Sequence, residues 1–376
     1  MSTEAKIAAI VPYKVYPAKM GGQKAIALFY QYLGNIIPVS IFSTGNNERA
    51  ASEEFQPVLG NSVLRYGNIF LYGKLKRMMR SQSITHLFIE HPYMGWLGLL
   101  LKRSLRVPLI VRSHNIESLR FKSIGKWWWG MLWHYERFVH RRADHNFFIT
   151  DEDKLFAIEH FRLDARRCHT ITYGFESSRP VADSIKQDAK RQLQIRHQLQ
   201  PGEKIILFNG TLDYQPNKTA LEAILKFINP LLLQQENFSY RIIICGNNLP
   251  ASFNGLENYR DKNIIYAGFV DDITLYFNGA DIFINPVTDG GGIKTKLVEA
   301  LGAGLSCIST KSGAIGVPSG ITGGKMQVTE DNDWKAFAEK TMAIDITGST
   351  PDGFYSHFYW GAIAKKAADI LQNKTV

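Results

Sequence analysis

Short apolar runs recur along the whole chain and alternate with segments whose apolar residues have helical spacing. These runs cover residues 7–11, 39–42, 86–89, 109–111, 147–149, 205–208, 241–245, 264–266, 282–284 and 305–309. Apolar runs of this length are typical of buried strands. Strands that alternate with helices indicate parallel sheets covered by helices. The pattern therefore predicts an α/β fold.

The stretch 282–310 adds a glycine turn to this pattern. Gly290, Gly291 and Gly292 separate a strand-like run from a helix-like segment, and a second strand-like run follows. Glycine lets the backbone approach a ligand closely and adopt positive φ. The following helix directs free N–H groups and the positive end of its dipole at the turn. This arrangement favours an anion over the glycines.

Two lysines and a glutamate surround the start of this helix. Lys294 and Lys296 lie in its first turns, and Glu299 shares a face with Lys296 because the two are three residues apart. A nucleoside diphosphate would satisfy both kinds of charge, with its phosphates over the turn and its ribose hydroxyls donating to Glu299. The alternative is a solvated Lys–Glu pair beside a turn that is common in α/β proteins.

A similar order opens the chain. The loop after the run 7–11 ends at Gly21 and Gly22, and a helix-like segment covers residues 23–34. Strand, glycine loop and helix indicate an anion-binding crevice at the carboxyl end of a parallel sheet. A simple tight turn explains the pattern equally well. The dinucleotide-binding pattern G-x-G-x-x-G is absent.

His114 is a candidate catalytic residue. It follows the run 109–111, at the end of a strand where the crevice of a parallel sheet places active residues. A lone histidine in a loop is more often structural, so the position alone leaves both interpretations open.

Two Asp-x-Asp patterns raise the alternative of a metal site. Asp151 and Asp153 follow Thr150 and precede a helix-like segment, and the pair Asp331 and Asp333 is also followed by helix-like sequence. Thr150 with Asp153 three residues later fits a helix capping box. We therefore expect helix caps here and no metal ligands.

The whole excess of positive over negative charge lies in the first half of the chain. The 376 residues carry a net charge of +10; residues 1–176 hold 24 Lys and Arg against 14 Asp and Glu, and residues 177–376 hold 20 of each. The first half should therefore meet an anionic partner, such as a lipid surface, a lipid-linked phosphate or nucleic acid. Three widely spaced cysteines show no metal or redox spacing, which favours a cytoplasmic protein. The longest apolar stretch, 94–101, is too short to cross a bilayer.

Tryptophans and basic residues are interleaved in the stretch 120–142. Trp127, Trp128, Trp129 and Trp133 lie there among arginines and lysines. Indole rings and cations together suit a membrane interface with anionic lipid. The alternatives are tryptophans packed in the core, although three consecutive ones cannot all face inward on one helix, and a nucleic-acid surface, for which no known module signature is present.

The chain resembles a known family. The order of Pro286, the glycine triplet, two spaced lysines, Glu299-Ala300-Leu301 and Gly304 is similar to the retaining glycosyltransferases of the GT-B fold, group 4. The resemblance extends to His114-Asn115-x-Glu117 and to the entry of the second half, Gly210 with Pro216-Asn217. It implies two Rossmann-like domains that face a central cleft, with a C-terminal helix that crosses back to the first domain.

The resemblance also implies roles for individual residues. Glu299 would contact the ribose, Phe269 and Val270 the nucleobase, and His114 would lie near the reacting sugars. Gly21 and Gly22 would lie across the cleft from the donor phosphates. Lys218, Gly210 and the Gly290–Gly292 turn would serve the diphosphate. The chain departs from the family at Gly291, where many members have a glutamate and Asp289 is the nearest carboxylate, and at Thr211 and Pro216, where many have an arginine and a lysine.

Together these features predict a glycosyltransferase of the hexosyltransferase type. The expected domains are residues 1–176 with 356–376 on the acceptor side, and residues 177–355 for the nucleotide sugar. The expected reaction transfers a sugar from the nucleotide sugar, with retention and without a metal or cofactor, to a lipid-linked or other glycan acceptor. We expect a peripheral place at the inner face of an anionic membrane, a role in polysaccharide biosynthesis and no nucleic-acid partner. The alternatives are a non-catalytic nucleotide- or partner-binding protein on the same fold, a nucleic-acid-binding protein, and a metal-dependent glycosyltransferase of the GT-A fold.

Overall fold

The chain folds as two compact units. The computed structural model describes residues 4–18, 21–48 and 55–372. Unit 1 comprises residues 1–176 and 359–376, and unit 2 comprises residues 177–358. The chain returns to unit 1 at Tyr359 and not at the expected residue 356, because helix α13 (Asp352–Phe358) contacts α11 (Thr295–Gly302) and the Tyr355 hydroxyl donates to the Gly302 carbonyl at 3.0 Å.

Unit 1 is built on a parallel sheet. Within the described ranges the sheet has seven strands in the order β3-β2-β1-β4-β5-β6-β7. These are β1 (Ile7–Val11), β2 (Val39–Thr44), β3 (Phe55–Leu59), β4 (His86–Glu90), β5 (Leu109–Ser113), β6 (His145–Phe148) and β7 (Cys168–Thr170). The chain order reverses between β1 and β4. In open parallel sheets such a switch point is where a crevice forms beyond the carboxyl ends of the strands.

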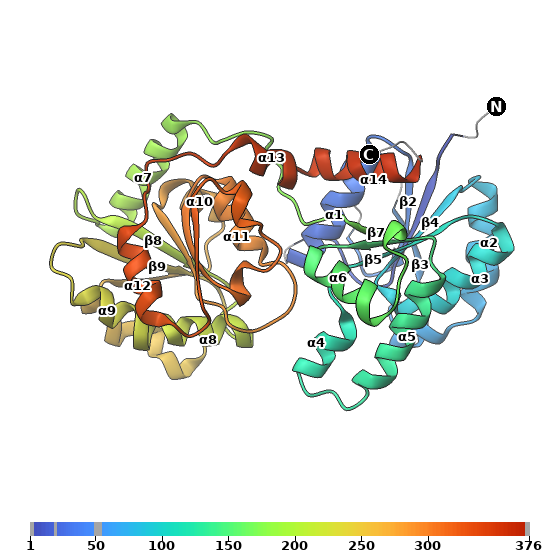
Figure 1. The fold of residues 1–376 in the computed structure, drawn as a ribbon, viewed down its shortest axis with the longest axis horizontal. Coiled ribbons are helices and arrows are strands. Elements are labelled where there is room, and N and C mark those ends of the chain that lie inside the picture. Colours follow the sequence, from blue (N-terminus) through green and yellow to red (C-terminus); the bar gives the residue numbers. More distant parts are fainter. Residues whose placement is uncertain (1–3, 19–20, 49–54, 373–376) are drawn as a thin grey trace. The chain divides into compact units, whose positions relative to one another are not determined.

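Helices cover both faces of this sheet (Figure 1). They are α1 (Gly21–Gly34), α2 (Phe70–Ser81), α3 (Gly95–Leu105), α4 (Glu117–Ser123), α5 (Trp129–Arg142), α6 (Asp151–His160) and α14 (Trp360–Leu371). Leu71, Leu75 and Met79 of α2 recur every four residues and pack in one core with residues of α3, α5 and one face of the sheet. On the other face Phe88 contacts Phe29 and Tyr30 of α1.

Unit 2 is a second, separate parallel sheet with its own helices. Its six strands in the described chain have the order β10-β9-β8-β11-β12-β13. They are β8 (Lys204–Asn209), β9 (Tyr240–Cys245), β10 (Ile264–Gly268), β11 (Ile282–Asn285), β12 (Ser306–Thr310) and β13 (Met326–Thr329). The switch point lies between β8 and β11. The strands that meet there are almost wholly buried, as expected for a sheet covered on both faces.

The helices of unit 2 form two layers. They are α7 (Asp183–His197), α8 (Gln215–Ala223), α9 (Asn229–Leu233), α10 (Ile273–Gly279), α11 (Thr295–Gly302), α12 (Trp334–Ala343) and α13 (Asp352–Phe358). Ile206, Ile242 and Ile282 point into one core with α8, α9 and α12. Helix α10 packs on α7 so closely that a Cβ at Gly279 would lie 2.8 Å from the Ala189 carbonyl oxygen.

The predicted α/β fold with two Rossmann-like units is confirmed, and each predicted strand is present. Three strands were not predicted: β3, β7 and β13. Each lies at an edge of its sheet, where one side of the strand meets no other strand and polar residues such as Gln56 or Gln327 are tolerated. The apolar-run criterion therefore finds every central strand and one edge strand, β10, whose residues 264–266 form an apolar run, and misses the other three edge strands. Within the described chain, no helix combines the length and the apolar character that a bilayer span requires.

The C-terminal segment completes unit 1. The helix-like sequence of residues 355–371 predicts one helix, but the structure has two, α13 and α14, which are separated at Tyr359. There Tyr359 bridges Phe175, and the Trp360 N–H donates to the Phe175 carbonyl at 3.1 Å. Helix α14 contacts α1, seen in Figure 1 as the red helix beside the blue one. The Trp360 side chain is fully buried against Tyr173. The predicted return of a C-terminal helix to the first domain is thus confirmed.

We expect Trp360→Ala to destabilise unit 1 by about 3–5 kcal/mol, because it empties a fully buried indole site. Chemical denaturation would measure the loss of stability. Hydrogen exchange would assign it to a unit, because α1 belongs to unit 1 and α8 to unit 2. Trp360→Phe, which keeps most of the packing, should cost much less. Equal exchange increases in α1 and α8, or no loss of stability, would contradict this account.

Candidate functional site

The switch point of unit 2 carries a lysine that joins two strand ends. Lys296 lies in the first turn of α11, which follows β11, and its Nζ donates to the Asn209 carbonyl at the end of β8 at 2.8 Å. A Cβ at Gly210 would lie 2.9 Å from the same Nζ. The amide of Asn217 lies nearer still, at 2.7 Å, so the ends of two side chains crowd the position after β8.

Burial perturbs this amine. Desolvation lowers the pKa of Lys296 to about 8, and the nearby Glu299 carboxylate opposes the shift. The two residues that were predicted to share a helix face, Lys296 and Glu299, therefore attract each other electrostatically in the structure. An amine with a pKa near neutrality loses part of its charge in the free protein, and an anion placed beside it would restore that charge.

The glycine turn is held by its own lysine. Gly290 has φ +85° and Gly292 has φ +71°, values that favour glycine. Lys294 was expected in the first turn of the helix but lies just before it, as the residue that caps α11. Its Nζ donates to the carbonyls of Gly290 at 2.8 Å and Gly292 at 3.0 Å. In this structure Lys294 fixes the shape of the turn.

The turn lies against the entry to α8. A Cβ at Gly290 would contact Pro216 at 3.3 Å and the Tyr214 hydroxyl at 3.7 Å. Lys218, one turn further along α8, is partly buried, whereas Asp289 and Gly291 are exposed. The structure thus gathers Gly210, Lys296, the glycine turn and the start of α8 at one edge of the sheet.

Two neighbouring strand ends complete this edge. The Gly246 N–H donates to the Gly268 carbonyl at 2.7 Å, and a Cβ at Gly246 would lie 1.9 Å from the Gly210 carbonyl oxygen. Phe269, directly after β10, is 71% exposed, and Val270 is partly buried. An exposed ring beside tightly packed glycines offers a flat apolar surface for a base. We had not predicted a role for Gly246, although its place after a strand was a usable signal.

In unit 1 the carboxyl ends of β4 and β5 share a buried charge. Glu90 ends β4, and Arg112 pairs with it in the sheet register. The Arg112 Nη1 donates to the Glu90 carboxylate at 3.1 and 3.2 Å, and the Tyr30 hydroxyl donates to it at 2.7 Å. Both side chains of the ion pair are completely buried. These residues were not predicted, because nothing local marks two opposite charges on different strands as partners.

This charge orients the predicted histidine. His114 Nε2 lies 2.9 Å from Glu90 Oε2 and 2.9 Å from Arg112 Nη1. Burial raises the pKa of Glu90, but Arg112 and His114 outweigh it and lower the pKa to about 2. The Arg112 Nη1 already donates to both Glu90 oxygens, and an ionised carboxylate only accepts, so we assign the proton of the ring to Nε2. Burial and Arg112 also lower the pKa of His114, which leaves a neutral ring with a basic Nδ1.

A second histidine packs against His114. The His91 ring lies 4.7 Å from the His114 ring and 6.1 Å from the Tyr13 ring, centroid to centroid. Its φ of 57° and ψ of 163° fall in a region that non-glycine residues rarely adopt and that is often retained at functional sites. Burial lowers the pKa of His91 to about 4, and the Glu117 carboxylate lies 3.4 Å from its Nδ1. The sequence signal for His91 was the same as for His114: a histidine after a strand.

Gly21 and Gly22 are the first two residues of α1 and not part of the preceding loop, so the helix begins two residues earlier than predicted. A Cβ at Gly22 would meet no atom within 4 Å. The space around Gly22 therefore does not by itself require glycine.

Both Asp-x-Asp patterns act at helix starts, as predicted. Thr150 caps α6 and accepts from the Asp153 N–H at 3.1 Å, and Asp333 caps α12 by accepting from the Ala336 N–H at 3.0 Å. Asp331 accepts from the Ser312 N–H at 3.0 Å. Across residues 4–18, 21–48 and 55–372, His, Cys, Asp and Glu side chains form no group of three or more that could hold a metal ion.

Comparison with known proteins decides the family. Residues 203–344 match the family described as Glycosyl transferases group 1, and residues 27–179 match Glycosyltransferase Family 4. The chain belongs to the group 1 glycosyltransferases. The predicted family is therefore confirmed on both units.

Solved glycosyltransferases share the GT-B fold with this one. Sucrose-phosphate synthase from Thermosynechococcus elongatus superimposes with a TM-score of 0.72 at 16% identity, over 98% of this chain and 99% of that one. Alr3699/HepE of Anabaena, in complex with UDP, gives a TM-score of 0.71 at 14% identity, over 98% and 100% of the two chains.

A curated relative matches over a shorter stretch. An uncharacterized 44.6 kDa protein in the cps region of Klebsiella pneumoniae is 28% identical over 144 residues. The match spans 36% of this glycosyltransferase and 35% of the relative, about a third of each length.

We expect Glu90→Gln to cost about 3–5 kcal/mol of stability, because it leaves the buried Arg112 charge without its counter-ion. The pKa of Glu90 is depressed from 4.5 to about 2, so the wild-type contribution is complete above about pH 4.5 and is lost as the pH falls toward 2. Urea denaturation at pH 7 and at lower pH should show that the difference between wild type and variant shrinks in acid. Glu90→Gln with Arg112→Met, which removes both charges, should recover much of the loss; a double variant as unstable as the single one would argue against the ion-pair account.

Proposed function

We propose that this glycosyltransferase transfers a sugar, with retention and without a metal, from a nucleoside diphosphate sugar to a glycan acceptor carried on a lipid. The contact that carries the proposal is the Lys296 amine on the Asn209 carbonyl, which places a cation across the switch point of unit 2 beside a glycine turn. The comparison structures include Alr3699/HepE in complex with UDP and with UDP-glucose, which supports a donor of this class.

The edge of unit 2 suits the parts of such a donor. The diphosphate would lie over Gly290–Gly292 and accept from backbone N–H groups at the start of α11, while Lys296 supplies full charge. The ribose hydroxyls would donate to Glu299, one turn further along the helix. Phe269 and Val270 would meet the base, and Lys218 and Gly210 would border the phosphates. Lys294 would keep the turn in shape.

The main barrier in such a transfer is charge that builds on the departing diphosphate. Preorganised donors stabilise that charge, and each is worth about 3 kcal/mol by analogy with measured oxyanion-hole losses. The family pattern of retention needs no enzyme nucleophile if the acceptor attacks on the face that the diphosphate leaves. His114 would then orient a sugar hydroxyl through its basic Nδ1, because Nε2 is held by Glu90.

The acceptor proposal rests on one surface of unit 1. Trp127 is 83% exposed, and Ile124 and Met131 near it are also exposed, together with Lys122 and Lys126. The other tryptophans are partly covered; Trp133, for example, packs on Phe161. An aromatic and basic surface of this kind suits the headgroup level of an anionic membrane. The cps-region relative supports a place in polysaccharide synthesis.

Lys296→Met should abolish the stabilisation by nucleotide and lower kcat by roughly 10²–10³ fold, because it removes a preorganised donor. The measurement is the shift in Tm with UDP, GDP, ADP, CMP and dTDP, in EDTA and again with Mn²⁺. In the wild type the affinity should fall as the pH rises above about 8, since the amine then loses its proton; the variant should lack this dependence.

Lys226→Met is the matched control. Lys226 is exposed, lies in the segment directly after α8, and pairs with Glu222 of α8. A shift seen only with Mn²⁺ would refute metal independence. Tight nucleotide binding with no transfer from any nucleotide sugar would favour the non-catalytic alternative.

Trp127→Ser with Met131→Ser should lower binding to vesicles of phosphatidylglycerol and phosphatidylcholine by about tenfold or more, because two exposed apolar side chains are lost from the interface. Cosedimentation with vesicles measures this. Phe227→Ser, at a half-exposed position in unit 2, serves as control. Unchanged binding in the double variant would remove this surface from the proposal.

A further inference from the structure

Unit 1 exposes a second group of large apolar side chains, at the loop that leads into α2. Val63 is 75% exposed, Leu64 77%, Ile69 69% and Phe70 82%. We call these four residues the apolar tip: Val63 and Leu64 lie in the 3-10 helix η1 (Val63–Gly67), Ile69 is the N-cap residue of α2, and Phe70 is the first residue of α2. Four large apolar side chains exposed to water within eight consecutive residues are costly, which suggests that a partner covers them.

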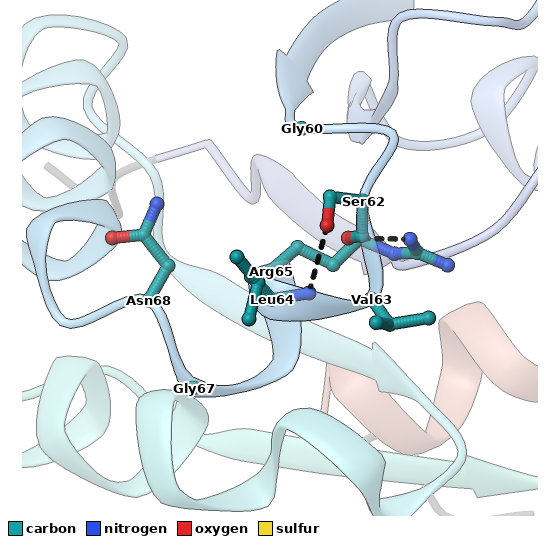
Figure 2. Close-up of a pocket in the computed structure, with 7 residues that line it drawn as sticks. All are labelled: Gly60, Ser62, Val63, Leu64, Arg65, Gly67 and Asn68. Carbon is teal, nitrogen blue, oxygen red and sulfur yellow. Dashed lines mark hydrogen bonds between the residues drawn. The ribbon is translucent and has the colours of Figure 1, made fainter.

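The apolar tip is held in place by an ordered loop. The Arg65 Nε donates to the Pro12 carbonyl at 2.6 Å, and its Nη1 donates to the carbonyls of Asn61 and Ser62 at 2.9 and 2.8 Å. The Ser62 hydroxyl accepts from the Leu64 N–H at 3.3 Å, a bond drawn in Figure 2. These bonds surround a hollow of about 580 Å³ with Val63 and Leu64 on its rim. The side chains therefore point outward because the loop is fixed, and not because it lacks structure.

The chain segment that carries the apolar tip has charges of one sign only. Residues 55–89 contain no Asp or Glu. On α2 the exposed residues Lys74, Arg77 and Arg80 follow Phe70 at helical spacing, so they continue along the face that begins at the tip. The opposite face of α2 is buried in the core. We call Lys74, Arg77 and Arg80 the basic stripe.

We propose that the apolar tip inserts into an anionic lipid bilayer while the basic stripe of α2 contacts the headgroups. A helix with one cationic face and apolar residues at its end is suited to the boundary between headgroups and acyl chains. A protein partner would need acidic groups for a stripe of this kind, and a second copy of this chain would oppose like charges. The bilayer is therefore the partner that matches both features.

The position of the apolar tip gives it a role in the proposed reaction. Arg65 fixes the loop to Pro12, directly after β1, and β1 borders the switch point at which His114 and His91 lie. Insertion of the tip would hold this edge of unit 1 at the membrane surface, where a lipid-linked acceptor presents its sugar. This inference deepens the proposed function and rests on it for the identity of the acceptor.

Leu64→Cys gives a direct test, because the three native cysteines are buried and a new exposed thiol can be labelled selectively. With an environment-sensitive NBD label, vesicles of phosphatidylglycerol and phosphatidylcholine should shift the emission to the blue, and nitroxide-labelled lipid should quench it. Ile195→Cys, which is equally exposed on α7 of unit 2, should show neither effect. Vesicle binding without quenching at position 64 would overturn the proposal, as would a shift that instead follows protein concentration without lipid.

Lys74→Ser with Arg77→Ser tests the basic stripe. Each lost cation should weaken binding to the anionic vesicles about fivefold, and vesicles of phosphatidylcholine alone should bind weakly in every case. Lys226→Ser with Lys335→Ser, two exposed lysines of unit 2, is the control. Equal binding by both double variants would refute the role of the stripe.

Hydrolysis of the nucleotide sugar, which releases UDP or another nucleotide without an acceptor, measures donor binding by unit 2 independently of the membrane. Quenching at position 64 in a protein that binds no nucleotide would overturn the proposed function and leave the insertion standing. Nucleotide binding without quenching at position 64 would overturn the insertion and leave the proposed function standing.

Discussion

Unit 1 depends on one buried charge, the carboxylate of Glu90. A lone carboxylate in such a place would be very costly, and it is kept ionised because Arg112, Tyr30 and His114 all donate to it. The same Arg112 also donates to the Ala25 carbonyl at 3.2 Å and lies over the Phe29 ring, so it attaches α1 to the sheet. The orientation of the histidine and the position of the helix therefore have a common cause.

Charged side chains at the strand ends are stabilised differently in the two units. In unit 1 the charges at the switch point are balanced by each other, and the histidine that results is neutral and directional. In unit 2 the amine of Lys296 bonds a backbone carbonyl, and its pKa is lowered because burial is only partly offset by Glu299. One edge thus holds a neutral imidazole in a fixed direction, whereas the other would gain stability from an added anion.

The features that the sequence could predict are those recorded in neighbouring residues. Central strands were identified from apolar runs, the caps at Thr150 and Asp333 from helix-start residues, and the glycine turn from three adjacent glycines. The ion pair of Glu90 with Arg112 joins strands 22 residues apart, and the contact of Lys296 with Asn209 spans 87 residues. Such pairs depend on sheet register and strand order, which local patterns do not contain. Three of the four edge strands, β3, β7 and β13, were missed for a different reason, because polar residues interrupt their apolar pattern.

The place of α14 has a consequence for how the protein is made. Tyr32 of α1 contacts Tyr359, and α14 covers α1 with residues that follow all of unit 2 in the sequence. All of unit 2 is synthesised between the two parts of unit 1, which takes roughly 10–40 s at common elongation rates. During that interval the surface of α1 that α14 will cover has no native partner. Unit 1 is thus begun before unit 2 and completed after it, and the nascent chain carries an open face on α1 until α14 has been made.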